Sequence, residues 1–171
     1  MSGLRACVAA CCAAVVLGGC FLSGGKTVHQ TGEIGQTLTG PGGLRVTPTK
    51  YRPRVPAKND VTGLGTPAPG THFASFLISI CITTTNLPTI SSRNFSLELD
   101  SGDEAALKSP QTVFSDDLNL LGEAGCEQGH IVFEVPTGGQ PSKLAFKLDY
   151  SRPDPNGGST FDTHVRLQWG V

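Results

Sequence analysis

The chain has 171 residues, of which 13 are Lys or Arg and 14 are Asp or Glu, for a formal net charge of −1. A balance so close to neutral gives no electrostatic basis for binding nucleic acid. The 22 Gly and 12 Pro residues, with a single Met, predict many turns and few helices. Without its N-terminal segment the chain keeps about 150 residues, which suits one domain with its own core.

Residues 1–19 are predicted to be an export signal. Arg5 precedes an apolar run of 12 residues, from Ala6 to Leu17. A membrane-spanning helix needs about 20 such residues, whereas a run of this length after a positive charge is typical of a secretory signal. Leu17-Gly18-Gly19-Cys20 resembles the lipobox of bacterial lipoproteins. The resemblance implies that Cys20 receives diacylglycerol and acyl chains such as palmitate, which anchor the mature chain in the membrane. The alternative is an ordinary secretory signal with an incidental Cys.

Residues 20–30 are predicted to be the lipidated Cys and a flexible tether, because the segment contains paired glycines and shows no period. Residues 31–171 are predicted to form one domain. Its first elements are two weak strands, Gly32 to Leu38 and Leu44 to Tyr51. The Pro-rich stretch from Arg52 to Gly70 has no period, and loops of that length tend to be functional or disordered.

Further along the chain, apolar residues alternate at period two, which predicts β-strands. The longest strand is predicted over 73–85, with Phe76, Ile78, Ile80 and Ile82 on one face. A shorter strand is predicted over 95–99, an edge strand over 111–114 and one helical turn over 116–121. Three more strands follow over 129–136, 143–150 and 163–169. Because only turn segments separate these three, they are predicted to be antiparallel neighbours.

The six cysteines predict one disulfide. Cys7, Cys11 and Cys12 fall in the signal and Cys20 carries the lipid, so Cys81 and Cys126 remain. In a chain exported to an oxidising compartment, these two residues are predicted to pair. Because Cys81 alternates out of phase with the isoleucines of its strand, the disulfide is expected to join the outer face of that strand to a loop. Two separate buried thiols are the alternative.

These elements predict an all-β fold, an antiparallel immunoglobulin-like β-sandwich of about seven strands, with a closed barrel as the alternative. Several segments resemble a family of immunoglobulin-like extracytoplasmic domains of unknown function, found in bacterial lipoproteins and secreted antigens. They are Gly32–Gly35 leading to Leu44–Thr47, Ile80–Asn86, Phe95–Leu97 with the acidic turn after it, and Gln128–Pro136. The resemblance spans about residues 31–170 and implies a sandwich and an envelope location. It implies no chemistry.

No catalytic residue, cofactor or metal site is predicted. The sequence lacks a Gly-x-Ser-x-Gly nucleophile pattern, and the protein is therefore expected not to be an enzyme. The four histidines are expected to lie on the surface without a metal, because a zinc site needs several ligands that the fold brings together. They are His29 in the tether, His72, His130 and His164.

Charge is unevenly distributed along the chain. Residues 98–127 hold eight carboxylates and one base, Lys108, whereas residues 26–58 hold six bases and one acid, Glu33. Such separation predicts one acidic and one basic region that steer a partner. The turn Asp100-Ser101-Gly102-Asp103-Glu104 also offers oxygen ligands of the kind that Ca²⁺ takes, although without the spacing of an EF-hand.

The function expected from the sequence is that of a lipoprotein anchored at the extracytoplasmic face of the cell membrane. Its β-sandwich is expected to be a non-enzymatic interaction domain, which binds an envelope protein or a small molecule through loops or an edge strand. The alternative is a carrier or sensor of a small ligand or Ca²⁺.

Overall fold

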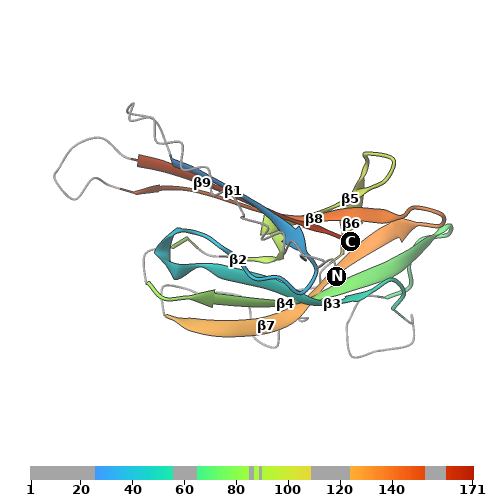
Figure 1. Ribbon diagram of the computed structural model, residues 1–171. Coiled ribbons are helices and arrows are strands. Elements are labelled where there is room, and N and C mark those ends of the chain that lie inside the picture. Colours follow the sequence, from blue (N-terminus) through green and yellow to red (C-terminus); the bar gives the residue numbers. More distant parts are fainter. Residues whose placement is uncertain (1–25, 56–64, 85–86, 89, 109–123, 153–160) are drawn as a thin grey trace, which may run out of the picture.

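The computed structural model describes residues 26–55, 65–84, 87–88, 90–108, 124–152 and 161–171. These residues form nine β-strands and two short 3-10 turns (Figure 1). The strands are β1 (Lys26–Glu33), β2 (Leu38–Thr39), β3 (Arg45–Arg52), β4 (Thr71–Ile82), β5 (Phe95–Leu99), β6 (Glu104–Leu107), β7 (Gly125–Pro136), β8 (Pro141–Arg152) and β9 (Phe161–Gly170). The 3-10 turns are η1 (Pro41–Gly43) and η3 (Ser92–Asn94).

The strands make two layers that face each other across the core. One layer contains β1, β9, β8 and β5, and the other contains β7, β4, β3 and β2 (Figure 1). The short strand β6 pairs with both β5 and β7, so the sheet is continuous in the order β1-β9-β8-β5-β6-β7-β4-β3-β2. All neighbouring pairs are antiparallel except β1 and β9, which run parallel. The predicted all-β sandwich is confirmed, with nine strands instead of about seven.

The core forms because alternate residues of each strand point between the layers. On β4, Phe76, Ile78 and Ile80 are fully buried, as the sequence predicts. On β9, Trp169 is fully buried, and its indole N–H donates to the carbonyl oxygen of Gln36 at 3.0 Å. A buried indole needs such a partner, because an unpaired polar group costs free energy away from water.

Side chains connect the two free edges of the sheet. The side-chain oxygen of Gln30 on β1 accepts from the backbone N–H of Thr39 on β2 at 2.8 Å, and its amide nitrogen donates to the Thr39 hydroxyl at 3.3 Å. Strands β1 and β2 thus lie against each other without forming a backbone ladder. The fold is therefore a sandwich that comes close to the closed barrel considered as the alternative.

The N-terminal boundary differs from the prediction. Strand β1 begins at Lys26 and pairs with β9 along its whole length, so residues 26–30 belong to the domain and not to a tether. The strand predicted over 32–38 is wrong between Glu33 and Leu38, because the chain turns there before β2 begins. Gly35 has a φ of 97°, a conformation that glycine adopts without strain, and its N–H donates to the carbonyl oxygen of Pro48. Residues 20–25 lie outside the described residues.

The positions of the remaining strands agree with the sequence-based predictions better than their pairing does. Strands β3, β4, β5, β7, β8 and β9 cover the predicted segments, although β4 ends at Ile82 and has the same length as β7 and β8. Strands β8 and β9 are antiparallel neighbours, but β7 pairs with β4 and β6, so its predicted pairing with β8 is wrong. The turn after Pro136 instead carries the chain from one sheet to the other. The edge strand predicted over 111–114 and the helical turn over 116–121 lie outside the described residues.

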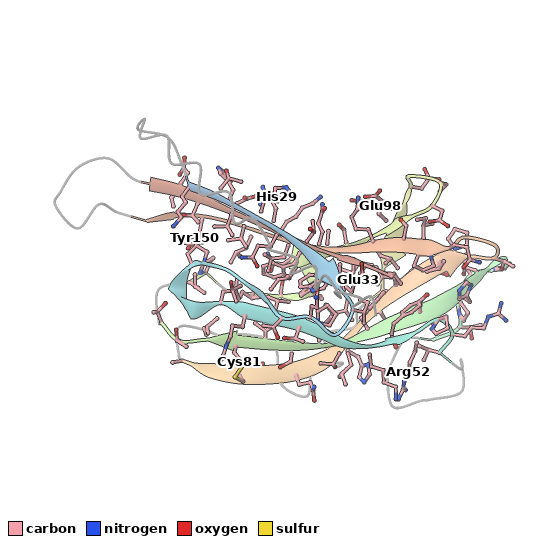
Figure 2. All side chains as sticks on the ribbon, in the orientation of Figure 1. His29, Glu33, Arg52, Cys81, Glu98 and Tyr150 are labelled. Atoms are coloured by element: carbon pink, nitrogen blue, oxygen red, sulfur yellow. A yellow bond between two sulfur atoms is a disulfide. The ribbon has the colours of Figure 1, made fainter. Side chains whose placement is uncertain are left out.

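A disulfide links Cys81 to Cys126 on the outer face of one sheet. The two residues are direct partners in the β4–β7 ladder, with their Cα atoms 4.0 Å apart. Figure 2 shows Cys81 on the side of β4 that faces away from the core. The expected outer-face position is correct, but the expected link to a loop is wrong, because Cys126 lies in β7.

Removing the disulfide is predicted to lower the free energy of unfolding. The bridge spans 45 residues, and on the chain-entropy model a loop of this size stabilises the fold by roughly 4 kcal/mol. Replacing Cys81 and Cys126 together by Ala should therefore lower the urea midpoint markedly without changing the far-ultraviolet circular dichroism of the folded protein. The double variant is compared with the reduced and alkylated wild-type chain, which should be destabilised similarly. An unchanged midpoint in both would contradict the prediction.

Candidate functional site

Four basic residues lie on or just after β3. Arg45, Lys50 and Arg52 belong to the strand and Arg54 follows it, and all four are exposed. None of them forms an ion pair within the part of the chain that the structure describes. We call these four residues the basic side. Because their charges are not neutralised by neighbouring carboxylates, they present a positive surface to any approaching molecule.

A β-bulge determines on which face of the sheet two of these basic side chains lie. Val46 and Pro48 face the core, so simple alternation would also turn Lys50 inward. The register instead shifts between Pro48 and Lys50, which leaves Thr49 as an extra residue in the strand. Lys50 and Arg52 therefore lie on the outer face, whereas Tyr51 turns inward and stacks on Phe76 with ring centroids 4.7 Å apart. A bulge of this kind re-aims side chains, and here it places two cations on the same face.

His130 of β7 lies on the same outer face. It is half-buried, and its direct partner across the β4–β7 ladder is Leu77, whose partner on β3 is Lys50. Burial lowers the pKa of the His130 imidazole, and the positive charges of Arg52 and Lys50 lower that pKa further. Burial is the largest cause, and the uncompensated charge of the basic side adds to it, because like charges disfavour the protonated imidazole.

The outer face of the opposite sheet is different, because its charges form pairs. Asp149 accepts from Arg166 at 2.7 Å and lies 2.8 Å from the Nδ1 atom of His164. The hydrogen bonds from Arg166 and then His164 lower the pKa of the Asp149 carboxyl. Further along the sheet, Lys143 pairs with Glu98 at 2.9 Å. Opposite charges thus meet across neighbouring strands at these two places, whereas the cations of the basic side have no such partners in the described residues.

The remaining histidines do not combine into a metal site. Within residues 26–171, apart from the gaps left by the undescribed segments, no three His, Cys, Asp or Glu side chains lie close enough together to hold a metal ion. His29 is an exposed residue of β1 and not part of a tether. His72 lies near the start of β4, and its Nδ1 atom is buried with no hydrogen-bond partner.

In the acidic turn, the Ser101 hydroxyl donates to the Asp103 carboxylate at 3.0 Å.

The buried carboxylate of Glu134 binds the C-terminal end of the Pro-rich loop. Glu134 lies on the outer face of β7 with 9% of its side chain exposed. It accepts from the backbone N–H of Ala68 and from the Thr71 hydroxyl, both at 2.6 Å. Lys108, just after β6, lies 3.0 Å from the other carboxylate oxygen. The loop predicted over 52–70 is therefore attached to the sheet at this end, and Phe73 and Val132 are buried on the same outer face.

A His–Asp pair is the described feature closest to a catalytic arrangement. His164 and Asp149 have the contact that orients the base in a catalytic triad. The structure shows no hydrogen bond from a described Ser, Thr or Cys side chain to the other ring nitrogen of His164. Asp149 instead shares its oxygen with Arg166. The pair is thus part of a surface charge cluster, and no described nucleophile is hydrogen-bonded to it.

Two of the predicted site residues are brought together and one lies outside the described residues. Cys81 and Cys126 form the disulfide, whereas Cys20 falls in the undescribed segment. The structure adds the bulge at Thr49 and the Glu134 contacts, which no sequence pattern predicted. Glu134 carried a signal for its burial, because it stands within the apolar run from Ile131 to Val135. No helix among the described residues is long and apolar enough to cross a membrane.

Comparisons with known proteins give fold similarity only. No family model and no curated protein matches this sequence. Similar solved structures include the secreted protein MPT63 of Mycobacterium tuberculosis, with a TM-score of 0.47 and 17% identity over 84% of this chain and 98% of that one. The candidate lipoprotein ycdA of Bacillus subtilis has a TM-score of 0.46 and 15% sequence identity over 70% of this chain. The match covers only 35% of the ycdA chain. An uncharacterized β-sandwich protein of Clostridium difficile has a TM-score of 0.41 and 12% sequence identity over 87% of this chain and 98% of its own chain.

The contacts of Glu134 predict acid sensitivity. The hydrogen bond from Thr71, then that from Ala68, and the nearby Lys108 lower the pKa of Glu134 to about 2, whereas an unfolded Glu has a pKa of roughly 4.3. The folded state therefore gains stability from this carboxylate above pH ~4.3, and the gain is lost as the pH falls toward 2. The variant Glu134→Gln should be less stable at neutral pH and should lose less stability on acidification. Urea unfolding at several pH values measures both effects.

The matched control is Glu98→Gln, which removes a carboxylate with a single ion-pair partner and greater exposure. This control should keep most of the acid sensitivity of the wild-type protein. Identical pH profiles for the wild-type protein and Glu134→Gln would contradict the assignment.

Proposed function

We propose that this protein is a lipid-anchored, non-enzymatic binding module at the extracytoplasmic face of the cell membrane. The basic side is the surface that contacts an acidic envelope protein. The observation that carries the proposal is the contrast between the two outer faces. One face has four exposed bases without ion pairs in the described residues, whereas on the other Asp149 pairs with Arg166 and His164, and Glu98 pairs with Lys143.

The location rests on two independent features of the chain. The first is the signal that ends in the lipobox-like Leu17-Gly18-Gly19-Cys20. The second is the disulfide between Cys81 and Cys126, a bond that forms and persists in oxidising compartments. Because Cys81 and Cys126 are consumed by the disulfide and Cys20 by lipid, the mature chain keeps no free thiol. That argues against a cysteine nucleophile.

The binding mode follows from the exposed charges of β3. Positive residues on a surface raise the rate of encounter with an acidic partner and select against basic ones. Strands β1 and β2 cover each other's edges through Gln30 and Thr39, so strand addition there is disfavoured. The exposed cations of β3 and the adjoining outer face are thus the better candidate for contact. The partner is expected to bind less tightly as the salt concentration rises.

The anchor is tested by the intact mass of the protein extracted from its host's membranes. The expected mature chain begins at Cys20 and carries acyl mass. Cys20→Ser should move the protein from the membrane fraction to the soluble extracytoplasmic fraction, because two or three acyl chains supply the membrane affinity. A chain without added mass, or Cys20→Ser protein that stays in the membrane, would refute the anchor.

The basic side is tested by charge reversal. The double variant Lys50→Glu with Arg52→Glu should lower the yield of the cross-linked envelope partner by about tenfold, since it replaces attraction by repulsion at two positions. The yield is read by mass spectrometry after cross-linking in intact cells. The wild-type complex should also weaken between low and high salt.

The matched control is Lys26→Glu with Lys143→Glu, which makes the same change in net charge away from the basic side. It should leave the yield unchanged. Equal losses in the two double variants, or none in either, would refute the assigned surface, and thermal unfolding confirms that both variants are folded.

A further inference from the structure

The chain between the proposed lipid anchor and the domain is short. Strand β1 begins at Lys26 and pairs with β9 from its first residue, so only residues 21–25 separate it from Cys20. Six steps from one Cα atom to the next span at most about 20 Å, whatever the conformation. A tether that ran to residue 30, as the sequence predicted, would span up to about 40 Å. That is the length of the sandwich itself, because the 12 residues of β4 rise by about 3.3 Å each.

The start of β1 lies at one end of the sandwich. Lys26 pairs with Thr163 near the beginning of β9, and Tyr150, which pairs with Thr163 from β8, lies toward the left of Figure 2. The other layer contributes η1 to this end, because Gly40, which precedes η1, lies next to Val165 of β9. We call the end formed by Lys26, the adjoining ends of β8 and β9, and η1 the anchor end.

The opposite end of the sandwich, which we call the far end, carries two turns. The acidic turn over 100–104 lies beside the turn between β7 and β8, because the backbone N–H of Asp100 donates to the carbonyl oxygen of Gln140 at 2.9 Å. Strand β4 begins at this end, and its 12 residues run toward η1. Figure 2 shows Arg52 and Glu98 toward the far end. The two turns are therefore a full strand length away from the start of β1.

Charge also distinguishes the two ends. At the anchor end, Lys26 is exposed and forms no ion pair in the described residues. The headgroups of an anionic bilayer attract such a cation. At the far end, the exposed Arg52 and Arg54 are matched in number by the exposed Asp100 and Asp103. Charge in the described residues thus draws the anchor end toward the bilayer and gives the far end no net attraction to it.

We propose that the anchor end rests on the headgroup surface of the bilayer and that the far end points away from it. The orientation rests on the lipid anchor proposed above and goes beyond it, because an anchor on a long tether sets no orientation. A coil of six steps has a mean span of about 13 Å, so the anchor end stays beside the surface. The far end would reach the surface only if the whole domain lay on its side.

In this orientation the basic side runs up the flank of the domain. Arg45 lies nearer the bilayer, because its partner on β4 is Cys81 close to the anchor end. Arg52 lies farther away, because its partner is Ser75. An acidic partner can therefore approach the basic side along the membrane without displacing lipid.

The test measures how close each end lies to the lipid headgroups. Mature lipidated protein from the host is incorporated into vesicles of phosphatidylethanolamine and phosphatidylglycerol. The vesicles include a lipid with a nitroxide on its headgroup, which quenches a fluorophore at contact range. Two matched variants each carry one fluorophore in place of an exposed threonine, Thr27→Cys at the anchor end and Thr137→Cys at the far end. We expect severalfold stronger quenching at position 27 than at position 137.

A longer tether tests the cause of the orientation. Insertion of about 20 Gly and Ser residues between Gly25 and Lys26 roughly doubles the mean span of the tether. The lengthened protein should still float with the vesicles, while the quenching at position 27 falls toward that at position 137. Thermal unfolding confirms that each variant is folded.

The outcomes for the orientation and for the anchor can be told apart. Unlabelled protein that does not float with the vesicles would refute both. Protein that floats but is quenched equally at the two positions, or more strongly at position 137, would overturn the orientation and leave the anchor intact. Unchanged quenching at position 27 in the lengthened protein would also overturn the proposal, because the tether would then not set the orientation.

Discussion

The architecture depends on the four residues of β6, which belong to both sheets at once. Glu104 and Ala105 extend one layer beside β5, and Ala106 and Leu107 extend the other beside β7. Backbone hydrogen bonds therefore continue around one side of the sandwich, from one layer to the other. The same crossing places Lys108 beside Glu134 and separates β6 from the start of β5. The contacts of the buried Glu134 carboxylate thus depend in part on one short strand.

The two outer faces of the sandwich use charge in different ways. Around Asp149, opposite charges on β8 and β9 meet and largely cancel. Along β3 the cations stand without described partners, and the half-buried His130 lies within their field. Surface ion pairs contribute little to stability, so the paired face gains little from its arrangement. The arrangement affects the electrostatic field instead. Because opposite charges around Asp149 cancel, the field near the protein is set mainly by the cations along β3.

Alternation at period two made much of this fold predictable from sequence. The bounds of β5 and the buried face of β4 were predicted correctly, because apolar side chains at every second position are the direct signature of a half-buried strand. Strand β1 was missed over residues 26–31 because none of its residues is fully buried, and its ladder with β9 is made by backbone groups that any sequence carries. Strand β6 was missed because Glu-Ala-Ala-Leu is short and rich in residues with low strand propensity.

The candidate sites were less predictable than the strands. The basic composition of residues 26–58 was visible in the sequence, but the side on which Lys50 lies depends on the bulge at Thr49. The disulfide was predicted from the number of cysteines, and its outer-face position from alternation. The partner strand was not predicted, because nothing local shows that Gly125 to Gln128 extend β7. The contacts of Glu134 with Ala68, Thr71 and Lys108 depend on which segments the fold brings beside β7, which is a tertiary property with no local signal.

The parallel pairing of β1 with β9 has a mechanical consequence. Any pull on the chain that precedes the domain enters at Lys26 and runs along β1, which is joined to β9 over eight residue pairs (Figure 1). A force along a strand stretches all rungs of its ladder together, whereas a force across the strand opens them one at a time. A force on the preceding chain thus loads β1 in the shear geometry, in which the backbone hydrogen bonds to β9 resist separation of the two strands together.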